Sequence, residues 1–326
     1  MLRPLLACAT ASALLLLLAA CSQKSADGDV TNPEAPPATE SNQTTTEKNP
    51  QSTPNDAPDG TETPIDIGNP NPGTTSGDPA TPDPGVSDKV DFSDVKITVN
   101  GEARHYVLAV PKNYDANKAY PLVIALHGDG GNARGFVTDS KLTAATGDQA
   151  IVAFPDQVLD LFTSYYDNND QRLVAATIIQ VKKNRNIDGG KIWGFGHSKG
   201  AFMLSEMGCR KPGLFTAFAS YAGGAPQEQN DNGEPDCPDA QGLPFLVMAG
   251  ENDPDFPGIQ FQADYWAGIA GCSTSKQSTT QGTAPAACQQ YKDCQHPVVF
   301  CKVQGFGHAP MYPSAATDTW KWFNSL

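Results

Sequence analysis

The segment at 196–200 has the pattern G-x-S-x-G, with Ser198 at its centre. An apolar run at 191–195 precedes it and a run of helical character at 201–207 follows it. A sharp turn from a strand into a helix holds such a serine in a strained, exposed conformation, and the flanking glycines permit the close backbone approach that the turn requires. The helix N-terminus favours negative charge developing beside it. This context predicts Ser198 as a nucleophile; a simple strand-to-helix connection that contains a serine is the alternative.

A second glycine-rich turn, at 127–132, follows the apolar run 122–126. Its glycines leave backbone N–H groups free to point at an oxyanion, and we expect the hole to combine the N–H of Lys199 with that of Asp129. His127, the first residue of the turn, is a candidate substrate contact. Phosphate binding is the competing interpretation, but the chain contains no G-x-x-x-x-G-K-[ST] segment.

The base that would activate Ser198 is expected after it in the chain, because the order of the catalytic groups in this class of fold is serine, acid, histidine. Of the five histidines, three precede or adjoin the serine. His296 lies before the apolar run 298–303 and therefore at the wrong end of that predicted strand. His308 lies just beyond the run, where its side chain can reach back across the sheet edge, and it is the predicted base.

The acid that would orient His308 is expected at the end of another predicted strand, 244–249. Asp253 follows that strand closely and is our choice. Glu251 and Asp255 are each two residues away and remain alternatives, and an acidic surface turn without a catalytic role is a further one.

The elements that would position these groups follow from the apolar pattern. Short apolar runs alternate with amphipathic ones from residue 90 onward, which is typical of strands alternating with helices. Strands are expected at 104–110, 122–126, 150–154, 191–195, 214–221, 243–249 and 298–303, and helices at 170–186, 201–207 and 315–326. This order predicts an α/β fold with a mostly parallel sheet flanked by helices, whose ligand site lies at the carboxyl ends of the strands.

The block from about Gly101 to Leu326 resembles a family of secreted esterases that includes polyhydroxybutyrate depolymerase-like enzymes and bacterial feruloyl and acetylxylan esterases. The matching segments are 106–111, 121–128, 154–156, 196–200, 250–257, 270–272 and 305–308. The resemblance implies an α/β-hydrolase fold, with Ser198 as nucleophile, Asp253 as acid and His308 as base.

Two departures from that family concern the substrate. Lys199 stands where the family usually has a small or polar residue, and Tyr165 and Tyr166 stand near a position where it often has tryptophan. The two tyrosines are candidates for lining the cleft, although an aromatic pair can equally be packing. Hydroxyalkanoate, ferulate, acetate and synthetic polyester esters all remain open as substrates.

The expected reaction is two-step acyl transfer, which needs neither a metal nor an organic cofactor. Two other classes of function remain open. One is a serine peptidase of the same fold, and the other is a surface-tethered binding module on an inactive hydrolase scaffold. We expect a monomer.

The N-terminus reads as a secretory signal at 1–21, with Arg3, an apolar core too short to span a bilayer, and small residues before Cys21. Residues 18–21 resemble the lipobox of bacterial lipoproteins, which implies cleavage before Cys21, a lipid on its sulfur and anchoring to a membrane. Ser22 then favours the outer membrane in a Gram-negative cell. Plain secretion is the alternative.

Residues 22–89 are expected to be a disordered acidic linker, with 90–326 as the single catalytic domain. The linker holds 12 acidic residues against 3 lysines and no aromatic residue, so it cannot bury enough apolar surface to offset the entropy cost of ordering. The net charge of −14 argues against nucleic acid as a partner and against electrostatic adsorption to anionic lipid.

Six cysteines remain beyond Cys21: Cys209, Cys237, Cys272, Cys288, Cys294 and Cys301. An even number in an exported protein suggests three disulfides. We expect Cys209 to pair with Cys237, since one follows the nucleophile region and the other precedes the next strand. Zinc binding is the rival idea, but the spacings lack a CxxC pair.

Overall fold

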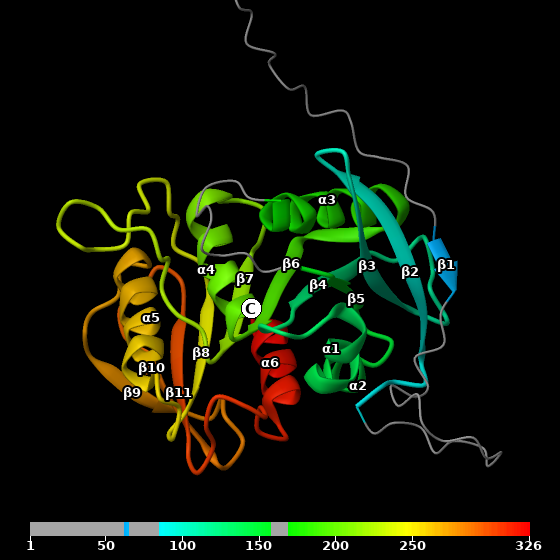
Figure 1. Cartoon of the computed structure of the whole chain (residues 1–326). Coiled ribbons are helices and arrows are strands. Elements are labelled where there is room, and N and C mark those ends of the chain that lie inside the picture. Colours follow the sequence, from blue (N-terminus) through cyan, green and yellow to red (C-terminus); the bar gives the residue numbers. More distant parts are fainter. Residues whose placement is uncertain (1–61, 65–84, 158–168) are drawn as a thin grey trace, which may run out of the picture. The chain divides into compact units, whose positions relative to one another are not determined.

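The computed structural model describes residues 62–64, 85–157 and 169–326 (Figure 1). All of them lie within one compact unit, Thr53–Leu326. The expected signal segment, Cys21, Tyr165 and Tyr166 lie outside the described residues.

The described residues form a single 11-stranded sheet. Its strand order is β1 (Glu62–Pro64), β2 (Val90–Val99), β3 (Glu102–Pro111), β5 (Ile151–Pro155), β4 (Tyr120–Leu126), β6 (Ile187–His197), β7 (Ala217–Tyr221), β8 (Phe245–Gly250), β11 (Val298–Val303), β10 (Ala286–Tyr291) and β9 (Lys276–Thr279). The central strands from β5 to β11 pair in parallel. The strands outside them pair antiparallel at both edges. The parallel sheet that we expected is therefore the centre of a wider one.

The parallel strands are apolar throughout because both faces of the sheet are covered. Every residue of β5, β7 and β8 is buried. The helices that cover them are α1 (Ala133–Ser140), α2 (Leu142–Thr146), α3 (Asn169–Asn184), α4 (Lys199–Arg210), α5 (Phe256–Ile269) and α6 (Ala315–Asn324). No helix of the described part is long and apolar enough to cross a bilayer.

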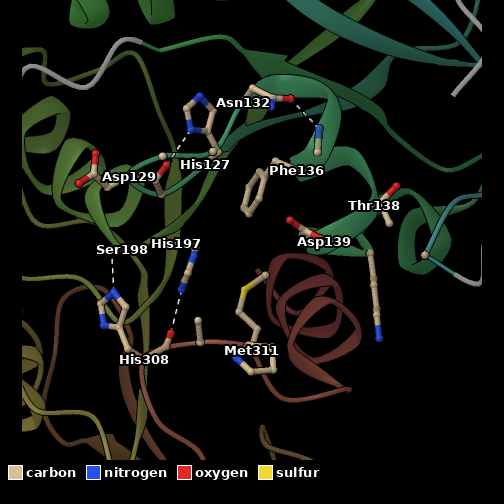
Figure 2. A pocket seen from close by; sticks show the side chains of 18 residues that line it. His127, Asp129, Asn132, Phe136, Thr138, Asp139, His197, Ser198, His308 and Met311 are labelled. Carbon is tan, nitrogen blue, oxygen red and sulfur yellow. Dashed lines mark hydrogen bonds between the residues drawn. The ribbon is translucent and has the colours of Figure 1, made fainter. Parts of the chain in front are cut away.

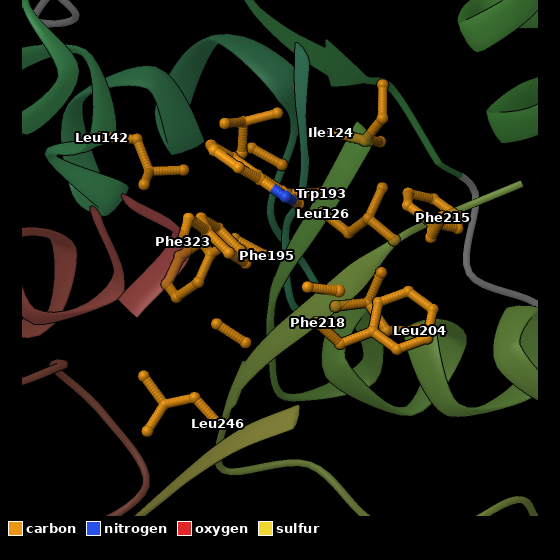
Figure 3. Packing of buried hydrophobic residues seen from close by; sticks show 14 of the residues in the cluster. Ile124, Leu126, Leu142, Trp193, Phe195, Leu204, Phe215, Phe218, Leu246 and Phe323 are labelled. Carbon is orange, nitrogen blue, oxygen red and sulfur yellow. The ribbon is translucent and has the colours of Figure 1, made fainter. Parts of the chain in front are cut away.

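Strand β6 shows how the two layers of helices are separated. Trp193 stacks on Phe323 of α6, with ring centroids 4.8 Å apart. A Cβ on the next residue, Gly194, would lie 2.6 Å from Cδ2 of Leu204 in α4. Since successive side chains of a strand point to opposite faces, α6 covers one face of β6 and α4 the other (Figure 3). The glycine permits α4 to pack closely, and α4 is the helix that begins behind Ser198.

Part of the expected linker joins the sheet. Residues 62–64 form β1, which pairs antiparallel with β2. Glu62 forms an ion pair of 2.7 Å with Arg185, and the Thr63 hydroxyl donates to the Asp94 carbonyl at 3.1 Å. Strand pairing with an exposed sheet edge needs no apolar side chains, so composition could not predict it.

The cysteines of the described residues form three disulfides, Cys209–Cys237, Cys272–Cys294 and Cys288–Cys301. The expected pairing of Cys209 with Cys237 is confirmed, and it joins the end of α4 to the long connection before β8.

Removing the Cys209–Cys237 bridge by replacing both cysteines with alanine is expected to lower the free energy of unfolding by about 2–4 kcal/mol. The bridge spans a sequence separation of 28 residues, and losing it restores conformational freedom to the unfolded chain. Urea denaturation of the variant and the wild type would measure the difference. A midpoint unchanged from the wild type would contradict the prediction.

Candidate active site

Ser198 lies at the turn between β6 and α4, with backbone angles φ 53° and ψ −125°. Such a positive φ is costly for a residue with a side chain and persists only where the surroundings enforce it. A Cβ on Gly196 would lie 2.5 Å from the Gly200 carbonyl, and a Cβ on Gly200 would overlap the Leu126 carbonyl. The two glycines of the motif are therefore required by close backbone packing, as the sequence predicts.

Ser198, His308 and Asp253 form a continuous chain of hydrogen bonds. Nε2 of His308 lies 2.7 Å from Oγ of Ser198, and Nδ1 lies 2.9 Å from Oδ2 of Asp253 (Figure 2 shows the first pair). The Asp253 side chain is 1% exposed, whereas that of His308 is 43% exposed. The structure thus brings together three residues from the ends of β6, β8 and β11.

The two alternative acids have other contacts. Glu251 accepts from Nζ of Lys302 at 3.0 Å, and this hydrogen bond lowers the pKa of Glu251. Asp255 lies on the other side of Asp253, and burial, followed by repulsion from Asp253, raises the pKa of Asp255. Of the three carboxylates, Asp253 is the one hydrogen bonded to His308.

The backbone that carries His308 is held by two side chains from neighbouring strands. Nε2 of His197 donates to the His308 carbonyl at 2.9 Å, and the Tyr221 hydroxyl donates to the Gly307 carbonyl at 3.2 Å. Burial lowers the pKa of His197. Burial also raises the pKa of Tyr221 to about 12, so its hydroxyl keeps the proton that it donates. His296, which is not the expected base, packs against Gly242, a residue in the connection that leads into β8.

His197 and Tyr221 support the base without any sequence pattern that indicates this role. Chain order excludes His197 as the base because it adjoins the serine. Its contact with the His308 carbonyl crosses 111 positions of the chain, and no local pattern marks it.

Replacing His197 with phenylalanine is expected to lower kcat for an ester substrate by about two- to tenfold, because the His308 carbonyl loses its donor. His197→Gln, which keeps an N–H donor, is expected to retain more of the activity. Steady-state kinetics of both variants would test this. A phenylalanine variant at least as active as the glutamine variant would contradict it.

The turn at 128–131 is fixed through the carbonyl of Gly128. That carbonyl accepts from the Gly131 N–H at 3.1 Å and from Nδ1 of His127 at 2.9 Å. Nε2 of His127 in turn accepts from the Gln157 N–H at 3.2 Å, which fixes the tautomer with the proton on Nδ1. Gly130, with φ 69°, adopts the left-handed conformation that this turn needs.

His127, the candidate substrate contact, also supports this turn. The residue is 2% exposed, and each of its ring nitrogens is bonded to the protein's own backbone. His127 lies in the wall of the cavity as well.

The two residues expected to supply oxyanion donors lie next to the nucleophile. Lys199 is the first residue of α4, immediately after Ser198. A Cβ on Gly128, the neighbour of Asp129, would lie 3.1 Å from Cβ of Ser198. The side chains of Lys199 and Asp129 form an ion pair of 3.0 Å.

A cavity of about 820 Å³ opens at Ser198 (Figure 2). Phe136, Thr138 and Asp139 of α1 line one side of it. Pro310 and Met311, from the segment after His308, also line it. The cavity therefore combines apolar and polar walls and is large enough for a drug-sized ligand.

No protein-family model matches the chain. It is 29% identical over 235 residues to "Probable feruloyl esterase C" of Aspergillus oryzae, covering 68% of this chain and 83% of that protein. It is 28% identical over 239 residues to "Feruloyl esterase C" of Emericella nidulans, covering 69% of this chain and 84% of that protein.

Solved structures show the same fold. An acetyl xylan esterase from Aspergillus awamori superposes with a TM-score of 0.58 at 18% identity, covering 72% of this chain and 99% of that one. The feruloyl esterase module from Clostridium thermocellum, in an S954A mutant complexed with sinapinate, gives a TM-score of 0.52 at 13% identity, covering 76% of this chain and 92% of that one. The chain has the α/β-hydrolase fold, as expected.

Proposed function

We propose that this protein is an extracytoplasmic serine esterase that hydrolyses feruloyl or related aromatic acyl esters. It is a carboxylic ester hydrolase of the serine type. The observation that carries the proposal is the hydrogen-bond chain from Ser198 through His308 to the buried Asp253. This arrangement generates a nucleophile from an ordinary serine and keeps the base in the required tautomer.

In the first step, Oγ of Ser198 attacks the ester carbonyl while Nε2 of His308 takes the hydroxyl proton. Asp253 stabilises the imidazolium that forms, since its carboxylate is bonded to Nδ1. The negative charge moves to the carbonyl oxygen and is stabilised by the backbone N–H groups of Lys199 and Asp129. The imidazolium then protonates the departing alcohol, which leaves an acyl group on Ser198.

In the second step, water replaces the alcohol. His308 takes a proton from the water, which attacks the acyl carbonyl through a second tetrahedral intermediate in the same oxyanion hole. Collapse of this intermediate returns the proton to Oγ of Ser198 and releases the carboxylic acid. The half-exposed ring of His308 is reachable by that water.

The size and lining of the cavity favour a substrate with an aromatic acyl group. An acetyl group would leave most of the 820 Å³ empty, whereas an aromatic acyl group would bury apolar surface against residues such as Phe136 and Met311. The names of the relatives agree with this choice. Acetate, hydroxyalkanoate and synthetic polyester esters are the competing substrates.

The substrate proposal is tested by comparing kcat/KM for methyl ferulate, methyl acetate and a hydroxybutyrate oligomer, with release of acid from polyester films as a fourth assay. We expect methyl ferulate to be the best of the three soluble substrates. A higher kcat/KM for the acetate or the oligomer would overturn the aromatic assignment and leave the esterase assignment intact.

The extracytoplasmic part of the proposal rests on the N-terminal pattern and is supported by the disulfides, which form and persist in oxidising compartments. Residues 1–21 direct export, Cys21 carries the lipid, 22–89 act as a tether with a docking point at β1, and 90–326 hydrolyse the ester. Labelling cells with a radioactive fatty acid should mark the wild type and not a Cys21→Ser variant. Equal labelling of both would overturn the anchor.

A further inference from the structure

The two residues whose N–H groups form the proposed oxyanion hole are also joined through their side chains. Nζ of Lys199 lies 3.0 Å from Oδ2 of Asp129, between the start of α4 and the turn after β4. We propose that this ion pair fixes the spacing of the two oxyanion donors, so that both side chains act as positioning groups. The inference rests on the proposed function and deepens it.

One side of the hole is already rigid. Gly200 packs its backbone against the Leu126 carbonyl, and the Ser198 N–H donates to the Tyr221 carbonyl at 2.9 Å. Lys199 lies between these two residues in the first turn of α4. The backbone N–H of Lys199 therefore has little freedom.

The other side depends on one peptide unit. The Gly128 carbonyl is held by donors from Gly131 and His127. Because a trans peptide is planar, the N–H of Asp129 points away from that carbonyl oxygen. The bonds to the Gly128 carbonyl therefore set the direction of the Asp129 N–H. The two residues that follow Asp129 in the turn are both glycines.

The ion pair adds a second restraint on this turn, at Asp129. Gly130 and Gly131 follow Asp129 directly, and glycine populates more backbone conformations than any other residue. Attaching the Asp129 side chain to Lys199 ties this turn to α4 at the point where the two donors must converge. Electrostatic stabilisation of an oxyanion depends on donors held to within about 0.5 Å, so a looser turn lowers the rate of the chemical step.

A direct effect of the Lys199 charge on the oxyanion is the main rival explanation, and the two explanations differ for Asp129→Asn. That variant keeps the lysine charge and releases it from its partner. A direct charge effect predicts an unchanged or higher kcat. Positioning predicts a lower kcat, because the turn is no longer tied to α4.

The test is a double-mutant cycle on Lys199→Met and Asp129→Asn, with kcat and KM measured on 4-nitrophenyl acetate. We expect each single variant to lower kcat by about two- to fivefold, the range for an exposed ion pair, with little change in KM. The double variant should be no slower than either single variant, since both changes break the same bond. Lys199→Arg should retain most of the activity.

Salt provides an independent readout. Asp129 is 66% exposed, so raising NaCl from about 0.05 to 0.5 M should screen the pair and lower kcat of the wild type more than that of Lys199→Met. Lys276→Met is the matched control, since Lys276 forms an ion pair of similar length and exposure with Asp264 and lies on β9, at the edge of the sheet. Its kcat should equal that of the wild type.

Melting temperatures of all variants would exclude a loss of folded protein as the cause. Unchanged kcat in Lys199→Met and Asp129→Asn, additive losses in the double variant, or an equal loss in Lys276→Met would overturn the positioning role. None of these results touches the esterase assignment, which fails instead if Ser198→Ala stays active.

Discussion

Replacing Ser198 with alanine is expected to reduce ester turnover by at least about 10⁴-fold while leaving the fold intact. The Ser198 hydroxyl is the group hydrogen bonded to Nε2 of His308, and no acyl-enzyme forms without it. Alanine keeps the Cβ atom and loses only the hydroxyl, so the change removes the chemistry and little else. The kcat on 4-nitrophenyl acetate and the unfolding midpoint in urea measure the two effects separately.

Labelling with a fluorophosphonate gives the control for this variant. The reagent should modify the wild type and not Ser198→Ala. Ser273→Ala, which removes an exposed hydroxyl bonded to that of Ser275, should label like the wild type. Labelling of Ser198→Ala, or turnover within tenfold of the wild type, would show that another residue is the nucleophile. An unlabelled wild type would instead favour an inactive scaffold that serves as a binding module.

The parts of the site that could be predicted are those that local sequence determines. The turn around Ser198 requires glycines within two positions of the serine, so the motif carries its own geometry. The strand β11, Val298–Val303, is apolar except for Lys302, and its observed bounds are those expected from the sequence. Chain order left two candidate bases, His296 and His308. His308 follows the carboxyl end of β11, which runs parallel to β8 and therefore ends at the same edge of the sheet as the other catalytic residues.

The parts that could not be predicted depend on contacts between distant segments. The strand β9 is entirely polar and β10 has no continuous apolar run, so neither carries a strand pattern of its own. They form because β10 pairs with β11 and β9 pairs with β10. The hydrogen bond from His197 to the His308 carbonyl likewise joins residues 111 positions apart in the chain, so no local pattern predicts it. Lys199 was noted as unusual for the position, but its partner lies 70 positions earlier in the chain, in another turn.

Replacing Asp253 with asparagine is expected to lower kcat by about 10⁴-fold. The Asp253 side chain is buried and bonded to Nδ1 of His308, so the amide would lose the charge that stabilises the imidazolium. An asparagine that donates its N–H to Nδ1 would also place the proton of the histidine on Nε2, where it can no longer accept the proton of Ser198. The shape of the side chain is kept, so the loss reports chemistry and not packing. Steady-state kinetics at saturating 4-nitrophenyl acetate would measure it.

Glu251→Gln and Asp255→Asn provide the matched controls, since each carries the same charge loss within two positions of Asp253. The Glu251 carboxylate faces Lys302 and the Gly305 N–H, so its amide variant should keep kcat within about threefold of the wild type. Asp255 lies close enough to repel Asp253, and its neutralisation should likewise leave kcat within about threefold. A larger loss of kcat in either control than in Asp253→Asn would show that the residue replaced in that control is the catalytic acid. All three variants replace a carboxylate with an amide, and only Asp253 of the three carboxylates is hydrogen bonded to His308. The order of their kcat values therefore tests that hydrogen bond.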